Sequence, residues 1–414
     1  MASIHAREKQ KKLFEIIADY TPIRGRKIPL ADEVRQAFME VPRHKFVRQF
    51  RLVGESDHIT PRSVDDIGAL DLIYSNQPLM YVDSAGRTLP ASNSEPAFIL
   101  HLLAMLDLRS GQRVLEIGCG TGWLLSIIAH LIGRTGEVIG IEILDTLAEQ
   151  ARNNIQAVDS SNITVICGNG ASANFDLGKF DRVIFTASTY EIPDYLFDIT
   201  KQDGLLLVPL RNRGPAEEAV LLRRIPTGFE SQEVRLCKFV PLISNWSMTD
   251  PSGVKPLPEN GFWPSIIQDR RRKKAFHFSP GDVKTQLYRT LPFTAFLSRT
   301  EPQFRVFSLS PSAGMGGLER AIFGDPITIA LALGREEFRS ATLWHQGELW
   351  ELGENSTATQ DFERAFDDWN ARGKPTGAEF KLAVSRQDKG QNFLASNNQW
   401  HEIRGNHLFT WTIA

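Results

Sequence analysis

The segment Val114–Trp123, VLEIGCGTGW, constrains the fold of this chain more than any other stretch. It begins as an apolar run typical of a buried strand, and Gly118, Gly120 and Gly122 follow where that strand turns into a helix. Glycine lets the backbone approach a bound molecule closely, and the free N–H groups at the start of the helix point toward it. The segment therefore predicts a ligand-binding turn between a strand and a helix.

Two acidic residues narrow the class of ligand. Dinucleotide-binding turns usually have the spacing GxGxxG, whereas this turn reads GxGxG and is preceded by Glu116. A carboxylate at that position repels a pyrophosphate and suits a ligand that carries ammonium and sulfonium charges. The next predicted strand ends in GIEI, where Glu142 can accept hydrogen bonds from both ribose hydroxyls, unless it is simply a solvated strand end. These features favour S-adenosylmethionine, with predicted binding residues Glu116, Gly118, Cys119, Gly120, Thr121, Gly122, Glu142 and Ile143.

Length and composition exclude several other classes of protein. A chain of 414 residues is too long for one core, so we expect two domains. A formal net charge of −2 with 23% charged residues argues against a nucleic-acid partner. The three cysteines, Cys119, Cys167 and Cys237, lack metal-ligand spacing and favour a reducing compartment. Without a signal-peptide pattern or an apolar run of about 18 residues, a cytoplasmic protein with no membrane partner is predicted.

The residues before the glycine turn predict helices and one long loop. Helices are expected over 8–20 and 31–40, and the VPRHKFV motif at 41–47 is expected to leave Arg43 and His44 exposed, His44 in a structural role. The stretch Leu70–Pro96 lacks regular periodicity and reads as an ordered loop that precedes a helix over about 96–107. This loop is the candidate binding segment for the methyl acceptor.

From Arg113 onward the pattern alternates between strands and helices, which predicts an α/β fold with a doubly wound, mainly parallel, Rossmann-like sheet. An antiparallel pair of strands at 218–225 and 234–242 is expected at the edge of this sheet. The predicted strands are 113–117, 137–143, 163–167, 180–186 and 204–210, and the predicted helices are 121–132, 145–158 and 192–199. Asn169 and Gly170 follow the third strand and are candidates for an adenine contact, although Asn-Gly is also an ordinary turn.

Several separated motifs together resemble the protein-L-isoaspartate O-methyltransferase family. VPRHKFV, YSNQPL at 74–79, VLEIGCGTGW, GIEI and FDRVIFTASTYEIP at 180–193 follow one another in the family's order. LLLVPL at 205–210 and VRLCKFVPL at 234–242 are similar to its closing strands, so the resemblance covers about residues 8–245. It implies an S-adenosylmethionine-dependent enzyme that esterifies an aspartate or isoaspartate carboxylate of a peptide or protein, with the ester collapsing to a succinimide.

The chain departs from the family at the acceptor segment and at one adenine contact. The family's Thr-Ile-Ser-x-Pro is replaced by TLPASNSEP at 88–96, which leaves Thr88, Ser92 and Ser94 as the candidate catalytic hydroxyls. Either Ser92 or Ser94 would take the place of the family's serine. Asn169 stands where the family usually has an acidic residue, and its amide oxygen can still accept a hydrogen bond.

The chain also continues far beyond the length of the repair enzymes. A linker over 246–265 and an α+β domain over 266–414 are predicted, with strands near 303–309, 326–333, 340–352, 379–386 and 407–413 and a helix at 361–372. Residues 366–384 resemble extended family members that methylate aspartate in ribosomally made peptides such as lanthipeptides, which implies that this domain recognises a peptide. The basic run Arg270–Lys274 fits either acidic-peptide recognition or a solvated linker or helix face, and PSAGMGGLER at 311–320 is better explained as a flexible connection than as a phosphate loop.

The predicted chemistry needs no strong base and no metal ion. A carboxylate is already ionised at neutral pH, so orientation and exclusion of water are the main contributions that the enzyme must make. Two alternatives remain: a small-molecule O- or N-methyltransferase, for which His44 or His58 would have to act as a base, and a non-catalytic cofactor-binding adaptor. The oligomeric state is not predicted.

Overall fold

The computed structural model describes the chain in segments that fall into two compact units. The described residues are 2–21, 29–158, 161–172, 176–214, 217–243, 252–258, 260–278, 283–308, 329–345, 347–387 and 398–413. The N-terminal unit comprises Met1–Leu210 and Ala219–Ser247, and the C-terminal unit comprises Arg211–Glu218 and Met248–Ala414.

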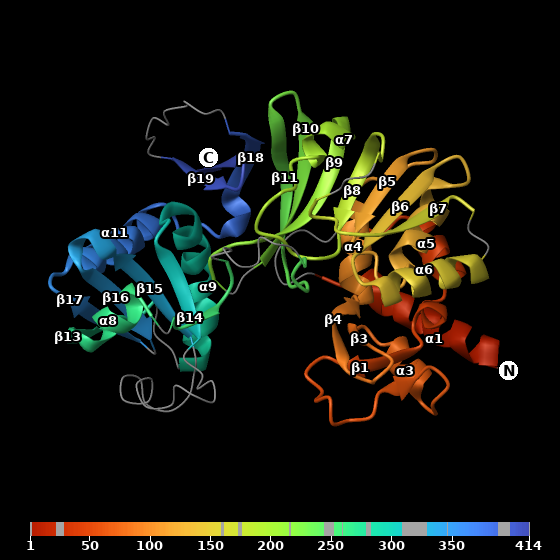
Figure 1. Cartoon of the computed structure of the whole chain (residues 1–414), viewed down its shortest axis with the longest axis horizontal. Coiled ribbons are helices and arrows are strands. Elements are labelled where there is room, and N and C mark those ends of the chain that lie inside the picture. The colour runs from red at the N-terminus through yellow and green to blue at the C-terminus, as the bar shows by residue number, and fades with distance from the viewer. Residues whose placement is uncertain are drawn as a thin grey trace. The chain divides into compact units, whose positions relative to one another are not determined.

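The N-terminal unit is built on a twisted sheet whose strands follow the order β11-β10-β9-β8-β5-β6-β7 (Figure 1). β5 lies between β6 and β8 and is parallel to both, and β6–β7 and β8–β9 are also parallel pairs. Two residues join β10 to β11, a connection that makes them an antiparallel hairpin. The strands are β5 (Arg113–Ile117), β6 (Glu137–Glu142), β7 (Ile163–Cys167), β8 (Phe180–Phe185), β9 (Thr200–Arg211), β10 (Glu217–Ile225) and β11 (Gly228–Cys237). The predicted Rossmann-like α/β architecture is confirmed.

Helices bury the faces of this sheet because their apolar residues recur at helical spacing. α5 packs against α2 and β6, while α6 packs against β6 and β7. One hydrophobic core joins Ile17, Phe38, Leu100 and Ile128 to the buried strand residue Val114. The helices are α1 (Ala2–Asp19), α2 (Asp32–Glu40), α4 (Pro96–Met105), α5 (Trp123–Ile132), α6 (Asp145–Ala157) and the single turn α7 (Leu196–Ile199), which is shorter than the predicted helix 192–199.

A second, antiparallel sheet precedes the glycine turn, with strand order β2-β1-β3-β4. Its strands are β1 (Gln49–Leu52), β2 (Arg62–Ser63), β3 (Leu79–Val82) and β4 (Thr88–Asn93); the short helix η1 (Arg43–Phe46) precedes β1 in the chain, and α3 (Ala69–Ile73) lies between β2 and β3. The prediction of an irregular loop over 70–96 was therefore wrong. β3 and β4 pair as a hairpin, with Leu79 opposite Asn93, and its alternation was obscured by hydroxyl side chains and Pro90.

The C-terminal unit combines a mixed sheet of order β12-β14-β15-β16-β17-β13 with three strands of order β19-β20-β18. Helix α11 packs on β15, β16 and β17. Its elements are β12 (Lys255–Pro256), α8 (Phe262–Gln268), β13 (Arg270–Ala275), α9 (Val283–Thr300), β14 (Phe304–Ser308), β15 (Ile329–Arg335), η3 (Glu336–Phe338), β16 (Ser340–His345), β17 (Glu348–Gly353), α11 (Thr357–Ala371), η4 (Gly377–Glu379), β18 (Phe380–Arg386), β19 (Gln399–Arg404) and β20 (His407–Ile413).

The predicted α+β class of the C-terminal region is confirmed, but several of its helices and strands differ from those predicted. The single strand predicted over 340–352 is the hairpin of β16 and β17, and α9 and β19 were not predicted. The basic run Arg270–Lys274 is neither a linker nor a helix face, because it forms β13, with Lys273 bonded to Glu348 and Lys274 to Glu363. PSAGMGGLER lies outside the described residues. Within the described part of the chain, no helix is long and apolar enough to cross a membrane.

Candidate functional site

The three glycines of the turn after β5 adopt backbone conformations that side chains disfavour. Gly118, Gly120 and Gly122 have φ angles of 90°, 54° and 84°. A Cβ on Gly120 would lie 3.2 Å from the Tyr81 hydroxyl oxygen, and one on Gly122 would lie 3.1 Å from Ile155. The turn therefore needs glycine for both its conformation and its packing.

Glu142, at the end of β6, holds the turn from the neighbouring strand. Its carboxylate accepts hydrogen bonds from the backbone N–H of Gly120 at 2.8 Å and of Leu144 at 3.0 Å. Burial raises the pKa of Glu142, and the backbone donors oppose that effect. Glu142 is buried rather than a solvated strand end, and its carboxylate lines a cleft together with Gly118, Gly120, Ile143, Gly170 and Ser92, which we call the glycine cleft.

Glu116, inside β5, is a buried carboxylate without a cation beside it among the described residues. Its Oε2 atom has no hydrogen-bond partner, and its Oε1 atom lies 3.4 Å from the Thr186 hydroxyl. Burial raises the pKa of Glu116 to about 8. It lines a smaller recess with Cys119, Gly120, Tyr81, Ser92 and Ser94, which we call the inner pocket. A positively charged ligand group would satisfy this carboxylate.

Three predicted cofactor-binding residues make contacts within the protein instead of facing the cleft. The Thr121 hydroxyl donates to the Phe46 carbonyl at 2.7 Å and lies 2.9 Å from the Tyr81 hydroxyl. Gly122 packs on α6 through Ile155. The Asn169 side chain accepts from the Ala171 N–H at 2.9 Å, which closes an ordinary Asx turn. Thr121, Gly122 and Asn169 are therefore not among the described residues that line the glycine cleft or the inner pocket. Gly170 does line the glycine cleft.

The candidate acceptor hydroxyls separate into two groups. Ser92 lines both the glycine cleft and the inner pocket, and Ser94 lines the inner pocket. Thr88 lies at the other end of β4, where its hydroxyl donates to Asp57 at 2.5 Å. Neither serine hydroxyl has a hydrogen-bond partner within the described part of the chain, so both are available to a ligand. Ser92 and Ser94 therefore lie beside the glycine turn, whereas Thr88 does not line the glycine cleft or the inner pocket.

Arg43 fixes the segment that carries these serines. Its guanidinium donates to the carbonyl oxygens of Asn93 at 3.0 Å and Ser94 at 2.9 Å, and its Nε donates to the Asn93 side chain at 2.7 Å. It also lies over the Trp123 ring, 5.5 Å from the centroid. The prediction that Arg43 is exposed was wrong: it is completely buried, because backbone carbonyls satisfy the guanidinium. Burial lowers the pKa of Arg43 to about 9, which leaves it charged at neutral pH.

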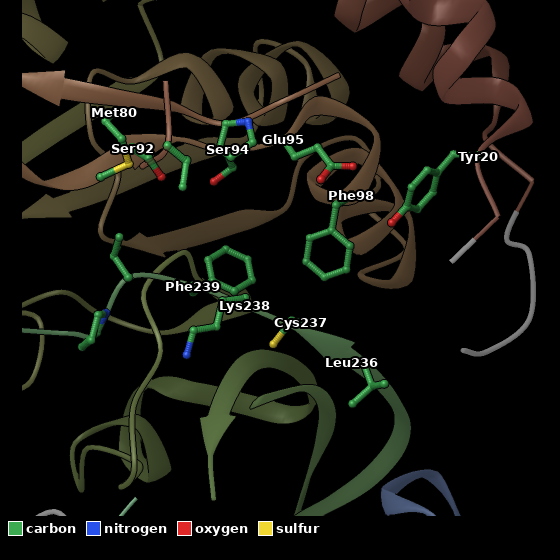
Figure 2. A pocket seen from close by; sticks show the side chains of 14 residues that line it. Tyr20, Met80, Ser92, Ser94, Glu95, Phe98, Leu236, Cys237, Lys238 and Phe239 are labelled. Atoms are coloured by element: carbon green, nitrogen blue, oxygen red, sulfur yellow. The ribbon is translucent and has the colours of Figure 1, made fainter. Parts of the chain in front are cut away.

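A larger cavity of about 680 Å³ opens beside the two serines (Figure 2). Figure 2 shows Ser92, Ser94 and Phe98 on one wall, with Phe239 facing them from the segment after β11. Most of its other lining residues are apolar, including Val53, Pro78 and Met80, and we call it the apolar cavity. Ser92 therefore borders the glycine cleft, the inner pocket and the apolar cavity.

Sequence reasoning missed three residues of the site. Thr186 follows β8, and its hydroxyl donates to the Gly118 carbonyl at 2.6 Å. It could have been found, because the carboxyl ends of adjacent parallel strands meet at one edge of the sheet. Tyr81 and Arg43 gave no such signal, since Tyr81 lies on β3, a strand that was not predicted, and Arg43 was predicted to be exposed.

Comparison with known proteins identifies the family. The family model for protein-L-isoaspartate(D-aspartate) O-methyltransferase matches residues 10–247. The chain belongs to this family. A protein-L-isoaspartate O-methyltransferase of Methanococcus aeolicus is 30% identical over 51% of this chain and 85% of its own length. One of Nitrobacter winogradskyi is 33% identical over 36% of this chain and 68% of its own length. A solved structure of a protein-L-isoaspartate O-methyltransferase is 17% identical, with a TM-score of 0.49 over 90% of this chain and 95% of that chain.

Membership makes this protein an S-adenosylmethionine-dependent carboxyl O-methyltransferase that acts on a protein substrate. The residues of the site fit that cofactor. The unpartnered Oε2 of Glu116 suits a cationic group, and Glu142 has a second lone pair on each oxygen for ribose hydroxyls. The glycines at 118 and 120 leave the backbone bare beside the cleft. Among the described residues, no cluster of three or more His, Cys, Asp or Glu side chains could hold a metal ion.

Proposed function

We propose that the enzyme esterifies the free carboxylate of an aspartate or isoaspartate within a peptide, that the neighbouring backbone nitrogen then displaces methanol from the ester to form a succinimide, and that the succinimide hydrolyses toward isoaspartate. The observation that carries the proposal is the position of Ser92 and Ser94, whose unpaired hydroxyls lie between the glycine turn and the apolar cavity. Their hydroxyls can donate to the acceptor carboxylate oxygen that does not attack.

The residues of the site divide the work of binding and orientation. Glu116 and Glu142 hold the cofactor, and Arg43 holds the serine segment rigid through the carbonyls of Asn93 and Ser94. When bound, S-adenosylmethionine supplies a methyl group that a carboxylate oxygen takes up as the carbon–sulfur bond breaks. Because orientation is the largest contribution available to this reaction, a rigid serine segment matters more than a strong base.

The absence of a nearby imidazole supports a carboxylate acceptor. No histidine is among the described residues that line the glycine cleft, the inner pocket or the apolar cavity. His44 is half-buried, and its Nδ1 atom lies 2.6 Å from the Tyr74 hydroxyl, while His58 is exposed. A neutral hydroxyl or amine acceptor usually needs a base to remove its proton, whereas a carboxylate is already ionised.

We assign recognition of the rest of the peptide to residues 266–414, together with the part of the predicted linker 246–265 that forms β12 and the start of α8. The region forms its own folded unit with buried aromatic side chains such as Phe293 and Trp369, and repair of a single damaged residue gives such a unit no obvious task. Its segment 366–384 resembles peptide-modifying members of the family, which favours tailoring of a ribosomally made peptide over general repair.

The test uses the full chain with S-adenosylmethionine labelled on its methyl group. Three acceptors are compared: an isoaspartyl peptide, the matched aspartyl peptide, and a mixture of small carboxylic acids and amines. Base-labile label on either peptide is the expected result, and the ratio of the two separates repair from tailoring. Alkali-stable label confined to small molecules, or cofactor binding without any transfer, contradicts the proposal.

A further inference from the structure

The apolar cavity is too large and too apolar to serve the acceptor carboxylate alone. Its volume is about 680 Å³, within the range of sites that enclose a whole small molecule. Val53, Pro78 and Met80 line it beside the aromatic rings of Phe98 and Phe239. These groups offer dispersion contacts and no hydrogen bonds, so they select for an apolar occupant.

We propose that the apolar cavity binds a bulky apolar side chain that neighbours the acceptor residue in the peptide, and that it thereby sets the sequence preference of the enzyme. The inference rests on the proposed function, because it requires a peptide acceptor. The occupant follows from continuity. Ser92 borders the cavity, the glycine cleft and the inner pocket, and Ser94 borders the cavity and the inner pocket, so a peptide whose carboxylate reaches the serines has its adjacent residues at the cavity.

The walls of the cavity fit an aromatic or large aliphatic side chain. The rings of Phe98 and Phe239 lie 5.9 Å apart between centroids and are tilted by 50°, which leaves ring faces and edges for a third apolar group. Val53 is 62% exposed and also lines the cavity, so an apolar residue is held at the surface where the peptide would enter.

The charged side chains on the walls of the cavity, Glu95 and Lys238, have opposite signs and together give it no preference for an acidic neighbour. Glu95 lines the cavity, where its carboxylate accepts a hydrogen bond from Asn76 at 2.9 Å, and burial raises its pKa. Tyr20 also lines the cavity, and burial there raises the pKa of its hydroxyl. A carboxylate brought into this mainly apolar space would lose water, and repulsion from Glu95 would offset attraction to Lys238.

The first experiment measures kcat/KM for a peptide series that shares one acceptor residue. The neighbours on each side are changed in turn to Phe, Leu, Ala or Glu, with the rest of the peptide constant. We expect the Phe or Leu peptide on one side to exceed the Ala peptide by about tenfold or more, and the Glu peptide to fall below the Phe and Leu peptides. Equal values across the series, or a preference for Glu, overturn the cavity proposal. If no peptide is methylated at all, the proposed function itself fails.

The second experiment moves the preference by changing the rim of the cavity. Val53→Asp should reduce the ratio of kcat/KM for the Phe peptide to kcat/KM for the Ala peptide by about tenfold. Ile59→Asp is the matched control, because Ile59 is 45% exposed and outside the cavity lining, so the ratio should not change. A ratio that is unchanged in both variants, or that falls equally in both, contradicts the assignment.

Discussion

The environment of Glu116 indicates the charge of the ligand group that binds beside it. Its carboxyl is completely buried, and the pKa near 8 means that the folded protein without ligand holds a proton there at neutral pH. A raised pKa in the folded state gives stability that is present below the ordinary value of about 4.5 and is lost as pH rises through about 8. A cation beside Glu116 reverses this effect, because it favours the ionised carboxylate.

Binding of S-adenosylhomocysteine, which keeps the ammonium group of the cofactor, should therefore release a proton below pH 8. We expect its affinity to increase between pH 6 and pH 7.5 by up to about tenfold per pH unit and to level off above pH 8. Isothermal titration calorimetry in buffers of different ionisation enthalpy measures both the affinity and the proton release. Glu116→Gln should flatten most of the profile, leaving the contribution of Glu142, whose pKa is also raised. An equally steep profile in the variant would contradict the role of Glu116.

The serine hydroxyls give a second prediction. Ser92→Ala and Ser94→Ala should each lower kcat/KM for the peptide by about 10- to 100-fold, because each removes a donor to a charged oxygen. The affinity for S-adenosylhomocysteine should stay within about threefold. Thr88→Val is the control, since the Thr88 hydroxyl is bonded to Asp57 away from the cavities, and its kcat/KM should change by less than about threefold. Loss of activity in Thr88→Val but not in the serine variants would reverse the assignment.

The sequence predicted the site residues that lie on a recognisable strand and turn. It missed the residues that long-range packing brings to the site. Glu116, Gly118 and Gly120 follow from a strand and a turn that any reader of the sequence can locate. Arg43 was predicted to be exposed because an arginine after a helix-ending proline usually is. Its burial depends on carbonyl groups of residues 73–94, which no local pattern brings near it.

Among the elements, the turn between β5 and α5 depends on glycine at position 120. Its φ of 54° costs a side chain about 1–2 kcal/mol, and a Cβ would also press on Tyr81 at 3.2 Å. Gly120→Ala should therefore weaken S-adenosylhomocysteine binding by more than tenfold, because the N–H that Glu142 holds must move. Calorimetric titration together with thermal unfolding separates the loss of binding from the loss of stability.

Gly54 provides the matched control for this substitution. It has a φ of 85°, yet a Cβ there would meet no atom within 4 Å. Gly54→Ala should cost a similar conformational penalty of about 1–2 kcal/mol and leave ligand affinity unchanged. If both variants lost affinity equally, general destabilisation rather than the geometry of the turn would explain the effect.

Elements with a strong periodic signal were predicted, and elements whose residues serve other purposes were not. The boundaries of β5 and β7 match the predicted strands because their apolar runs have no competing signal. The hairpin of β3 and β4 carries hydroxyls that face a binding site, so its alternation is weak. β13 is a run of basic residues, and its strand conformation depends on pairing with β17 and on acidic partners such as Glu348.

In the molecule as a whole, each compact unit is built from two separate stretches of the chain. Residues 211–218 lie within the range matched by the family model, yet the contacts group them with the C-terminal unit. The sequence predicted one boundary near residue 245, and that boundary remains a prediction. It could not show this segment, because the segment is tied to the C-terminal unit by contacts between residues far apart in the chain, such as the ion pairs of Glu218 with Arg299 and of Arg213 with Glu402.

The first of these ion pairs joins Glu218 to Arg299 in a fully buried setting. The guanidinium of Arg299 also lies over the rings of Phe380 and Trp411, at 4.9 and 4.6 Å from their centroids. A buried pair owes its value less to attraction than to the cost of leaving one charge alone, since both ions have lost their water. Burial lowers the pKa of Arg299, and Glu218 opposes that effect.

Glu218→Ala should accordingly lower the free energy of unfolding by about 3–5 kcal/mol, because it strands the Arg299 charge. The double variant Glu218→Leu with Arg299→Met should lose less than the single variant, since no unpaired ion remains. Asp269→Asn is the control: Asp269 pairs with Arg339 at the surface, and its loss should cost about 1 kcal/mol or less. Urea unfolding of the full chain measures all three. A double variant less stable than Glu218→Ala would contradict this account. It would mean that attraction between the two charges stabilises residues 211–218, and not only the cost of leaving one buried charge unpaired.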